Sequence, residues 1–120
     1  MSDDKLVTLV RRLRSRGGNV KWDKTEEDGT YETEFSGYAL QIAELEEEDQ
    51  DPIYQIRIFD GEGVLLDEFT DEDLTEIMNL TAPTEPSVMF AMMQDVYRGA
   101  RRSALGVDKA IDVILGALGG

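Results

Sequence analysis

The fold of this chain is decided by the stretch YALQIAELEEEDQDPIYQIRIFDGEGVLLDEF, residues 38–69. Apolar residues alternate with smaller or polar ones in two of its segments, and a period of two places such residues on one face of a β-strand. The alternating residues are Tyr38, Leu40 and Ile42 in the first segment and Tyr54, Ile56 and Ile58 in the second. The stretch therefore predicts strands at about 38–45, 53–60 and 63–69.

Turn signals connect these strands into hairpins. Asp60-Gly61 lies between two apolar runs, where Asp-Gly favours a tight turn. The linker 46–52 is polar and contains a proline, which cannot donate to a strand ladder. Weaker alternation upstream predicts two more strands, at about 19–24 and 30–36. We expect an antiparallel meander of about five strands, with one face in need of a cover.

Helical periodicity dominates the rest of the chain. Apolar residues recur at helical spacing in four segments, which predict helices at about 3–16, 71–78, 86–105 and 107–118. Thr70 and Asp73 have the spacing of a capping box at the start of the second. We predict a single α+β domain, residues 1–120, with the N-terminal helix and the C-terminal helices packed on one face of the sheet.

Composition excludes several kinds of chemistry. The chain has no cysteine and no histidine. Thiol catalysis, Cys-type zinc sites, Ser-His-Asp triads and histidine metal ligands are therefore impossible within one chain. Paired carboxylates could serve acid–base or divalent-metal chemistry, but twenty-six acidic residues produce such pairs by chance. We predict no enzymatic activity, no cofactor and no metal site.

The net charge of −14 is unevenly distributed along the chain. Residues 1–18 hold five basic and two acidic groups, residues 19–79 three basic and twenty acidic, and residues 80–120 four of each. An acidic sheet repels nucleic acid and anionic membranes, so neither is an expected partner. The acidic N-terminus lacks a signal-peptide core, and no apolar run has the length of a membrane span. We expect a cytoplasmic protein.

Arginines gather on two of the predicted helices. The candidate anion-binding residues are Arg12 and Arg16 on the first helix and Arg98, Arg101 and Arg102 on the third. If these helices are neighbours, their guanidinium groups could bind phosphate or carboxylate bidentately. The alternative is that they pair with the sheet's own carboxylates and are solvated.

The start of the third helix is apolar on all sides. Its candidate partner contacts are Val88, Met89, Phe90, Met92 and Met93. A surface helix needs only one apolar stripe, and methionine is frequent on adaptable binding surfaces. The run therefore indicates either contact with a protein partner, including a second copy in a homodimer, or burial inside the chain.

These observations favour a non-catalytic protein-interaction or regulatory module, such as an adaptor, an immunity protein or an inhibitor. A basic protein or a second copy of the chain is the expected partner, because an acidic face attracts basic surfaces. The alternative is a small-anion or nucleotide-binding protein that uses the helical arginines. No motif is specific to a named family.

The acidity has two interpretations, a salt-loving source or an ordinary acidic protein. Arginine outnumbers lysine eight to four, and heavy acidity with little lysine suits a halophile. Under the halophilic interpretation we expect the melting temperature to rise with KCl up to molar concentration, because salt screens self-repulsion. Thermal unfolding at increasing KCl measures this. An unchanged melting temperature contradicts the halophilic interpretation.

Overall fold

The computed structural model describes residues 2–80 and 82–119, and it contains one antiparallel sheet in the order β1-β2-β3-β4-β5. The strands are β1 (Asp23–Lys24), β2 (Thr30–Phe35), β3 (Tyr38–Leu45), β4 (Ile53–Phe59) and β5 (Leu65–Thr70). The helices are α1 (Ser2–Ser15), the 3-10 helix η1 (Gly17–Asn19), α2 (Asp71–Asn79), α3 (Pro86–Leu105) and α4 (Val107–Ala117). The predicted α+β fold is confirmed.

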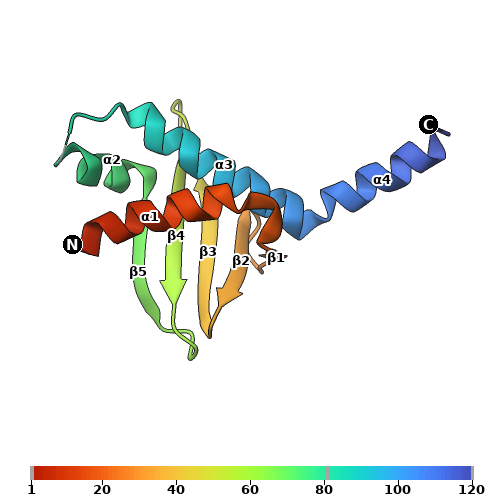
Figure 1. Cartoon of the computed structure of the whole chain (residues 1–120), viewed down its shortest axis with the longest axis horizontal. Helices are drawn as coiled ribbons and strands as arrows, with labels where there is room; N and C mark the ends of the chain where they lie inside the picture. The colour runs from red at the N-terminus through yellow and green to blue at the C-terminus, as the bar shows by residue number, and fades with distance from the viewer. Residues whose placement is uncertain (1, 81, 120) are drawn as a thin grey trace.

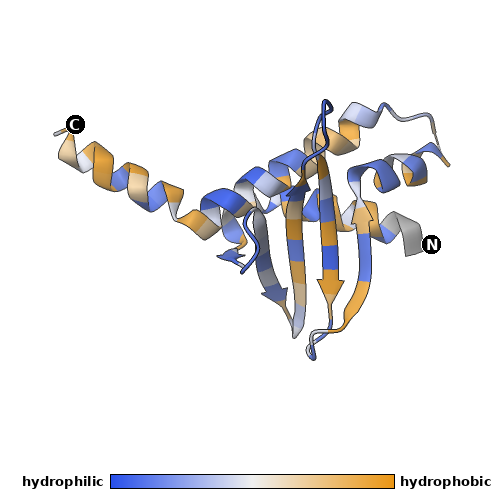
Figure 2. Cartoon of the chain, turned by 180° about the vertical axis from the view of Figure 1, so that it is seen from behind, coloured by the Kyte–Doolittle hydropathy of each residue, from blue (hydrophilic) through white to orange (hydrophobic). Residues whose placement is uncertain are grey.

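The helices cover one face of the sheet. Helices α1 and α3 lie side by side across that face, and α2 packs near the β5 end (Figure 1). Seen from behind, the opposite face of the sheet has no helix over it (Figure 2). The alternation of the strand sequences explains the two layers, since alternate residues in the middle of the strands, Leu40 and Ile42 in β3 and Tyr54 and Ile56 in β4, are buried under the helices.

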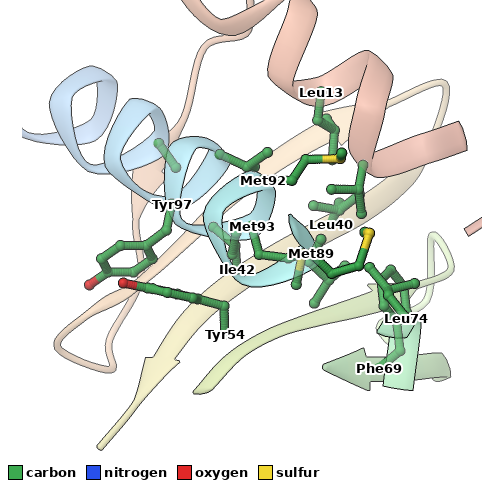
Figure 3. Packing of buried hydrophobic residues seen from close by; sticks show 14 of the residues in the cluster. Leu13, Leu40, Ile42, Tyr54, Phe69, Leu74, Met89, Met92, Met93 and Tyr97 are labelled. Atoms are coloured by element: carbon green, nitrogen blue, oxygen red, sulfur yellow. The ribbon is translucent and has the colours of Figure 1, made fainter. Parts of the chain in front are cut away.

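The core lies between α3 and the central strands. Met89 and Met93 of α3 are fully buried, as are Ile42 of β3, Ile56 of β4 and Leu74 of α2. Figure 3 shows the methionine side chains inserted between the sheet and the other helices. Methionine suits this position because its flexible, unbranched side chain fills irregular gaps.

Short turns fix the register of the outer hairpins. The β2–β3 turn has positive φ at Ser36 and Gly37, 51° and 89°, which matches the right-handed twist of the flanking strands. In the β4–β5 turn, Oδ1 of Asp60 accepts hydrogen bonds from the backbone N–H groups of Glu62 and Val64, both at 2.9 Å. The Thr70–Asp73 capping box predicted for α2 is present.

The first strand is shorter than its predicted range of 19–24. The backbone around it makes side-chain hydrogen bonds in place of strand-ladder bonds. Thr33 Oγ1 donates to the carbonyl oxygen of Lys21 at 2.8 Å, and the N–H of Trp22 donates to Ser103 Oγ at 2.9 Å. Only Asp23–Lys24 therefore pairs with β2 as a strand.

Helix α4 has the predicted bounds within one residue, but its position differs from the packed arrangement that we expected. It projects away from the sheet beyond the β1 edge (Figure 1). The 20 residues of α3 extend about 30 Å, whereas four strand spacings measure roughly 20 Å. The end of α3 therefore overshoots the sheet, and α4 begins where no strand lies beneath it.

Two leucine truncations test this arrangement. Leu74 is completely buried and Leu115 is 55% exposed. We expect Leu74→Ala to lower the free energy of unfolding by about 2–5 kcal/mol, because it leaves a cavity. Leu115→Ala, the matched control, should change it by no more than about 0.5 kcal/mol. Urea unfolding of dilute protein measures both, and equal losses would contradict an exposed α4.

Candidate interaction surfaces

Helix α4 exposes the most continuous apolar stripe of the chain. We call residues 107–118 the C-terminal arm. Its large apolar side chains are between 40% and 76% exposed. They are Ile111, Val113, Ile114, Leu115 and Leu118. No residue of α4 is buried, although the stripe has the spacing of a packed helix face (Figure 2). Exposed apolar patches of this kind mark sites of association.

The arm is joined to the body by a single glycine. Gly106 has φ 64° and ψ 36°, the left-handed conformation that ends α3 and redirects the chain. An ion pair between Arg102 and Asp108 spans this joint. An isolated helix of eleven residues is marginally stable in water, so α4 gains from any surface that covers its stripe.

A second apolar surface lies at the end of the sheet that the helices leave free. The two hairpin turns meet there, because a Cβ added to Gly61 would lie 3.2 Å from the carbonyl oxygen of Gly37. Five apolar residues beside these turns are between 45% and 54% exposed. They are Phe35, Tyr38, Val64, Leu65 and Leu66, and we call this surface the distal sheet end.

The sequence contains a signal for the distal sheet end that we did not use. Three apolar residues in a row, 64–66, break the alternation that a half-buried strand shows. The structure has a register shift between Ile58 and Phe59, opposite the start of β5. An unbroken apolar run beside a turn therefore indicated an irregular strand end with exposed apolar groups.

The uncovered face of the sheet is polar. Gln41 Nε2 donates to Glu32 Oε1 at 2.9 Å, and Arg57 Nε lies 3.3 Å from Glu68 Oε2. The Arg57 contact is an ion pair without hydrogen-bond alignment. Both ion-pair partners are partly exposed, so the pair adds little to stability. This face provides charge rather than an apolar contact.

The arginines of α1 do not converge with those of α3. Arg14 Nε lies 3.0 Å from Asp95 Oδ2, so position 14 faces α3. Arg12 is two residues away, about 200° around the helix, and it is exposed. Arg16 lies just beyond the end of α1 and is also exposed. The structure therefore does not bring Arg12 to the arginines of α3.

The α3 arginines divide into two groups. Arg98 and Arg101 are neighbours on one helix face. Burial raises the pKa values of Tyr54 and Tyr97, and the charges of Arg98 and Arg101, respectively, offset a small part of that rise. Arg102 instead pairs with Asp108. Helical spacing brings all three α3 arginines close together, but Arg102 is engaged by Asp108, so Arg98 and Arg101 remain as the candidate anion-binding pair.

Most of the predicted partner contacts lie in the chain's own core. Met89, Met92 and Met93 are buried, which accounts for the apolar start of α3 (Figure 3). Val88 is exposed and Phe90 is partly buried. Phe90 packs on Tyr54, with ring centroids 5.5 Å apart. Contact of Val88 or Phe90 with a partner stays a prediction.

A cluster of tyrosines joins α3 to the sheet. The rings of Tyr31 and Tyr54 each pack on Tyr97, with centroids 5.6 Å and 5.3 Å away. Tyr54 Oη donates to Glu44 Oε2 at 2.8 Å and accepts from Gln94 Nε2 at 3.3 Å. Burial, followed by the charges of Tyr31 and Glu44, raises the pKa of Tyr97 to about 12. Burial also raises the pKa of Tyr54, so Tyr54 and Tyr97 are neutral packing groups at physiological pH.

One open depression of about 920 Å³ lies where the β3–β4 loop meets the beginnings of α2 and α3. Its lining includes Asp49, Asp51, Asp71 and Phe90. Asp71 is buried, and its Oδ1 accepts the backbone N–H of Tyr54 at 2.9 Å. Burial raises the pKa of this carboxyl. Asp71 thus holds α2 to β4. The sequence predicted only that this residue begins a helix, and gave no signal of its hydrogen bond to the sheet.

Among the side chains that the structure describes, those of residues 5–17, 19–80 and 82–119, no three acidic groups come close enough together to hold a metal ion. Within residues 2–80 and 82–119, no helix combines the length and the hydrophobicity needed to cross a bilayer. Comparisons of the chain with protein-family models, curated proteins and solved structures give no significant match. The surfaces described above are therefore the basis for a functional proposal.

The tyrosine cluster generates a pH-dependent prediction. Below pH 10 Tyr97 is protonated in both the folded and the unfolded chain. Between pH 10 and about 12 the unfolded chain ionises first, so the protein loses stability as the pH rises. We expect Tyr97→Phe to lose less stability across this window than the wild type. Urea unfolding at a series of alkaline pH values measures it, with the exposed Tyr38→Phe as control. Parallel losses in wild type and Tyr97→Phe would contradict the assignment.

Proposed function

We propose that this chain is a non-catalytic protein-interaction or regulatory module whose docking element is the C-terminal arm. The observation that carries the proposal is an apolar stripe exposed along the whole of α4. Fully burying an exposed leucine or isoleucine side chain contributes roughly 1.5–3 kcal/mol. The side chains of the arm are about half exposed, so a partner that covers several of them gains roughly half of that amount from each. A helix laid into an apolar groove is a recurring mode of protein recognition.

The charge distribution supports the same proposal. Residues 19–79, which include the whole sheet, carry twenty acidic and three basic groups. Such a surface accelerates encounter with a basic partner and disfavours acidic competitors. The apolar arm would then supply affinity, and the acidic sheet would supply selectivity.

The non-catalytic part of the proposal rests on side chains with structural tasks. The chain has no histidine or cysteine. Two of the groups whose pKa burial raises, Asp71 and Tyr54, are engaged in hydrogen bonds that join elements of the core. A small-anion or nucleotide binder is the alternative, and it now rests on Arg98 and Arg101 alone.

Capture of partners by the immobilised chain tests the proposal. Leu115→Glu places a carboxylate in the stripe, and Gly116→Glu places the same group on the polar side of the same helix, where an added side chain meets open space. We expect wild type and Gly116→Glu to retain the same proteins from the host lysate, and Leu115→Glu to lose them by roughly tenfold or more. Quantitative mass spectrometry measures the retained proteins.

Identical captured sets from all three baits would contradict docking through the arm. Repeating the capture at high salt separates the two contributions, because salt weakens steering by the sheet and leaves apolar contacts in place. A thermal shift with phosphate or nucleotides that disappears in Arg98→Gln would instead favour the anion-binding alternative.

A further inference from the structure

The chain carries two apolar surfaces that cannot cover each other within one molecule. The C-terminal arm projects beyond the β1 edge, whereas the distal sheet end lies at the tips of the β2–β3 and β4–β5 hairpins (Figures 1 and 2). Among the described residues, α4 makes substantial contact with α3 alone. Each surface therefore needs a second molecule to cover it.

The two surfaces have borders of opposite charge. Residues 34–38 and 60–68, which include the distal sheet end and its neighbours along the chain, contain five acidic residues and no basic one. Residues 98–118, which comprise the arm and the end of α3 that holds it, contain four basic and two acidic residues. An apolar centre with an acidic border thus matches an apolar centre with a basic border. A second copy of the chain therefore offers each surface an apolar partner with a border of the opposite charge.

The available area matches the requirement of a modest dimer. The two surfaces together hold ten large apolar side chains, each roughly half exposed. At about 25 cal/mol per Å², the transfer free energies of such side chains correspond to roughly 100 Å² each, so a half-exposed one presents about 50 Å². Ten of them in each of two chains give on the order of 1,000 Å² of buried apolar surface. A specific interface needs about that much area. One arm without a reciprocal contact would bury only half of it.

We propose that the C-terminal arm of one copy docks on the distal sheet end of a second copy, and that two reciprocal contacts close a two-fold dimer. This inference rests on the proposed function, because it names a second chain as a partner of the same arm. Two-fold closure uses both surfaces of both chains, whereas an unreciprocated contact would continue into a filament.

Light scattering coupled to gel filtration tests the proposal on the full chain. We expect a wild-type dimer, and we expect Leu115→Glu on the arm and Leu66→Glu on the distal sheet end each to weaken it by roughly tenfold or more. All the substituted residues are exposed, so the variants should keep the fold, as circular dichroism checks. Gly116→Glu and Leu80→Glu are the matched controls and should remain dimeric, since Leu80 is 79% exposed and outside both surfaces.

Mixing the two defective variants provides the decisive measurement. Leu115→Glu keeps an intact distal sheet end, and Leu66→Glu keeps an intact arm. A mixed pair therefore has one intact contact, whereas a pair of either variant alone has none, so the mixture should associate more strongly than either variant by itself, although less strongly than the wild type. Hydrogen exchange of residues 107–117 should slow in the dimer, because a covered helix opens less often.

Three outcomes overturn the inference. They are a monomeric wild type at millimolar concentration, a dimer that Leu115→Glu breaks and Leu66→Glu does not, and a continuing series of larger masses in place of a dimer. If the chain is monomeric while capture of another protein still depends on Leu115, self-association fails and the proposed function stands. If capture is also independent of Leu115, both fail.

Discussion

The structure depends on the packing of one long helix across a sheet that is apolar on a single face. Helix α3 contributes Met89, Met93 and Ala100 to the core, all completely buried, against the inward residues of β3 and β4. That contact gives the meander its cover and fixes the direction of the chain after it. Because α3 is longer than the sheet is wide, the same contact leaves α4 without a surface to pack on.

Local patterns predicted most of the elements because the forces that create them are local. Alternation in 38–45 and 53–59 reflects a pleated strand with one buried side, and both strands appear as expected. The first strand was predicted too long because its limits depend on Thr33 and Ser103, which are distant in sequence. Hydrogen bonds of that kind leave no periodic signal.

The candidate surfaces were harder to predict, because periodicity shows that a helix face is apolar without showing what covers it. The stripes of α3 and α4 have similar spacing, yet Met93 is buried by this chain and Leu115 is not. Helical spacing alone could have shown that Arg12 and Arg14 point in different directions. Only the fold shows that Arg14 is the one that meets Asp95.

In the dimer that we propose, the charge of the chain and its exposed arm would act together. Two copies with a net charge of −14 each repel one another at long range. In most orientations this repulsion therefore opposes contact through an apolar stripe. The favoured approach brings the arginines near the arm toward a carboxylate-rich surface. Arg98 and Arg101 lie on α3 just before the arm, where they can set this orientation. In the proposed association, the acidic sheet restricts which surfaces the arm can reach, and the restriction relaxes as salt screens the repulsion.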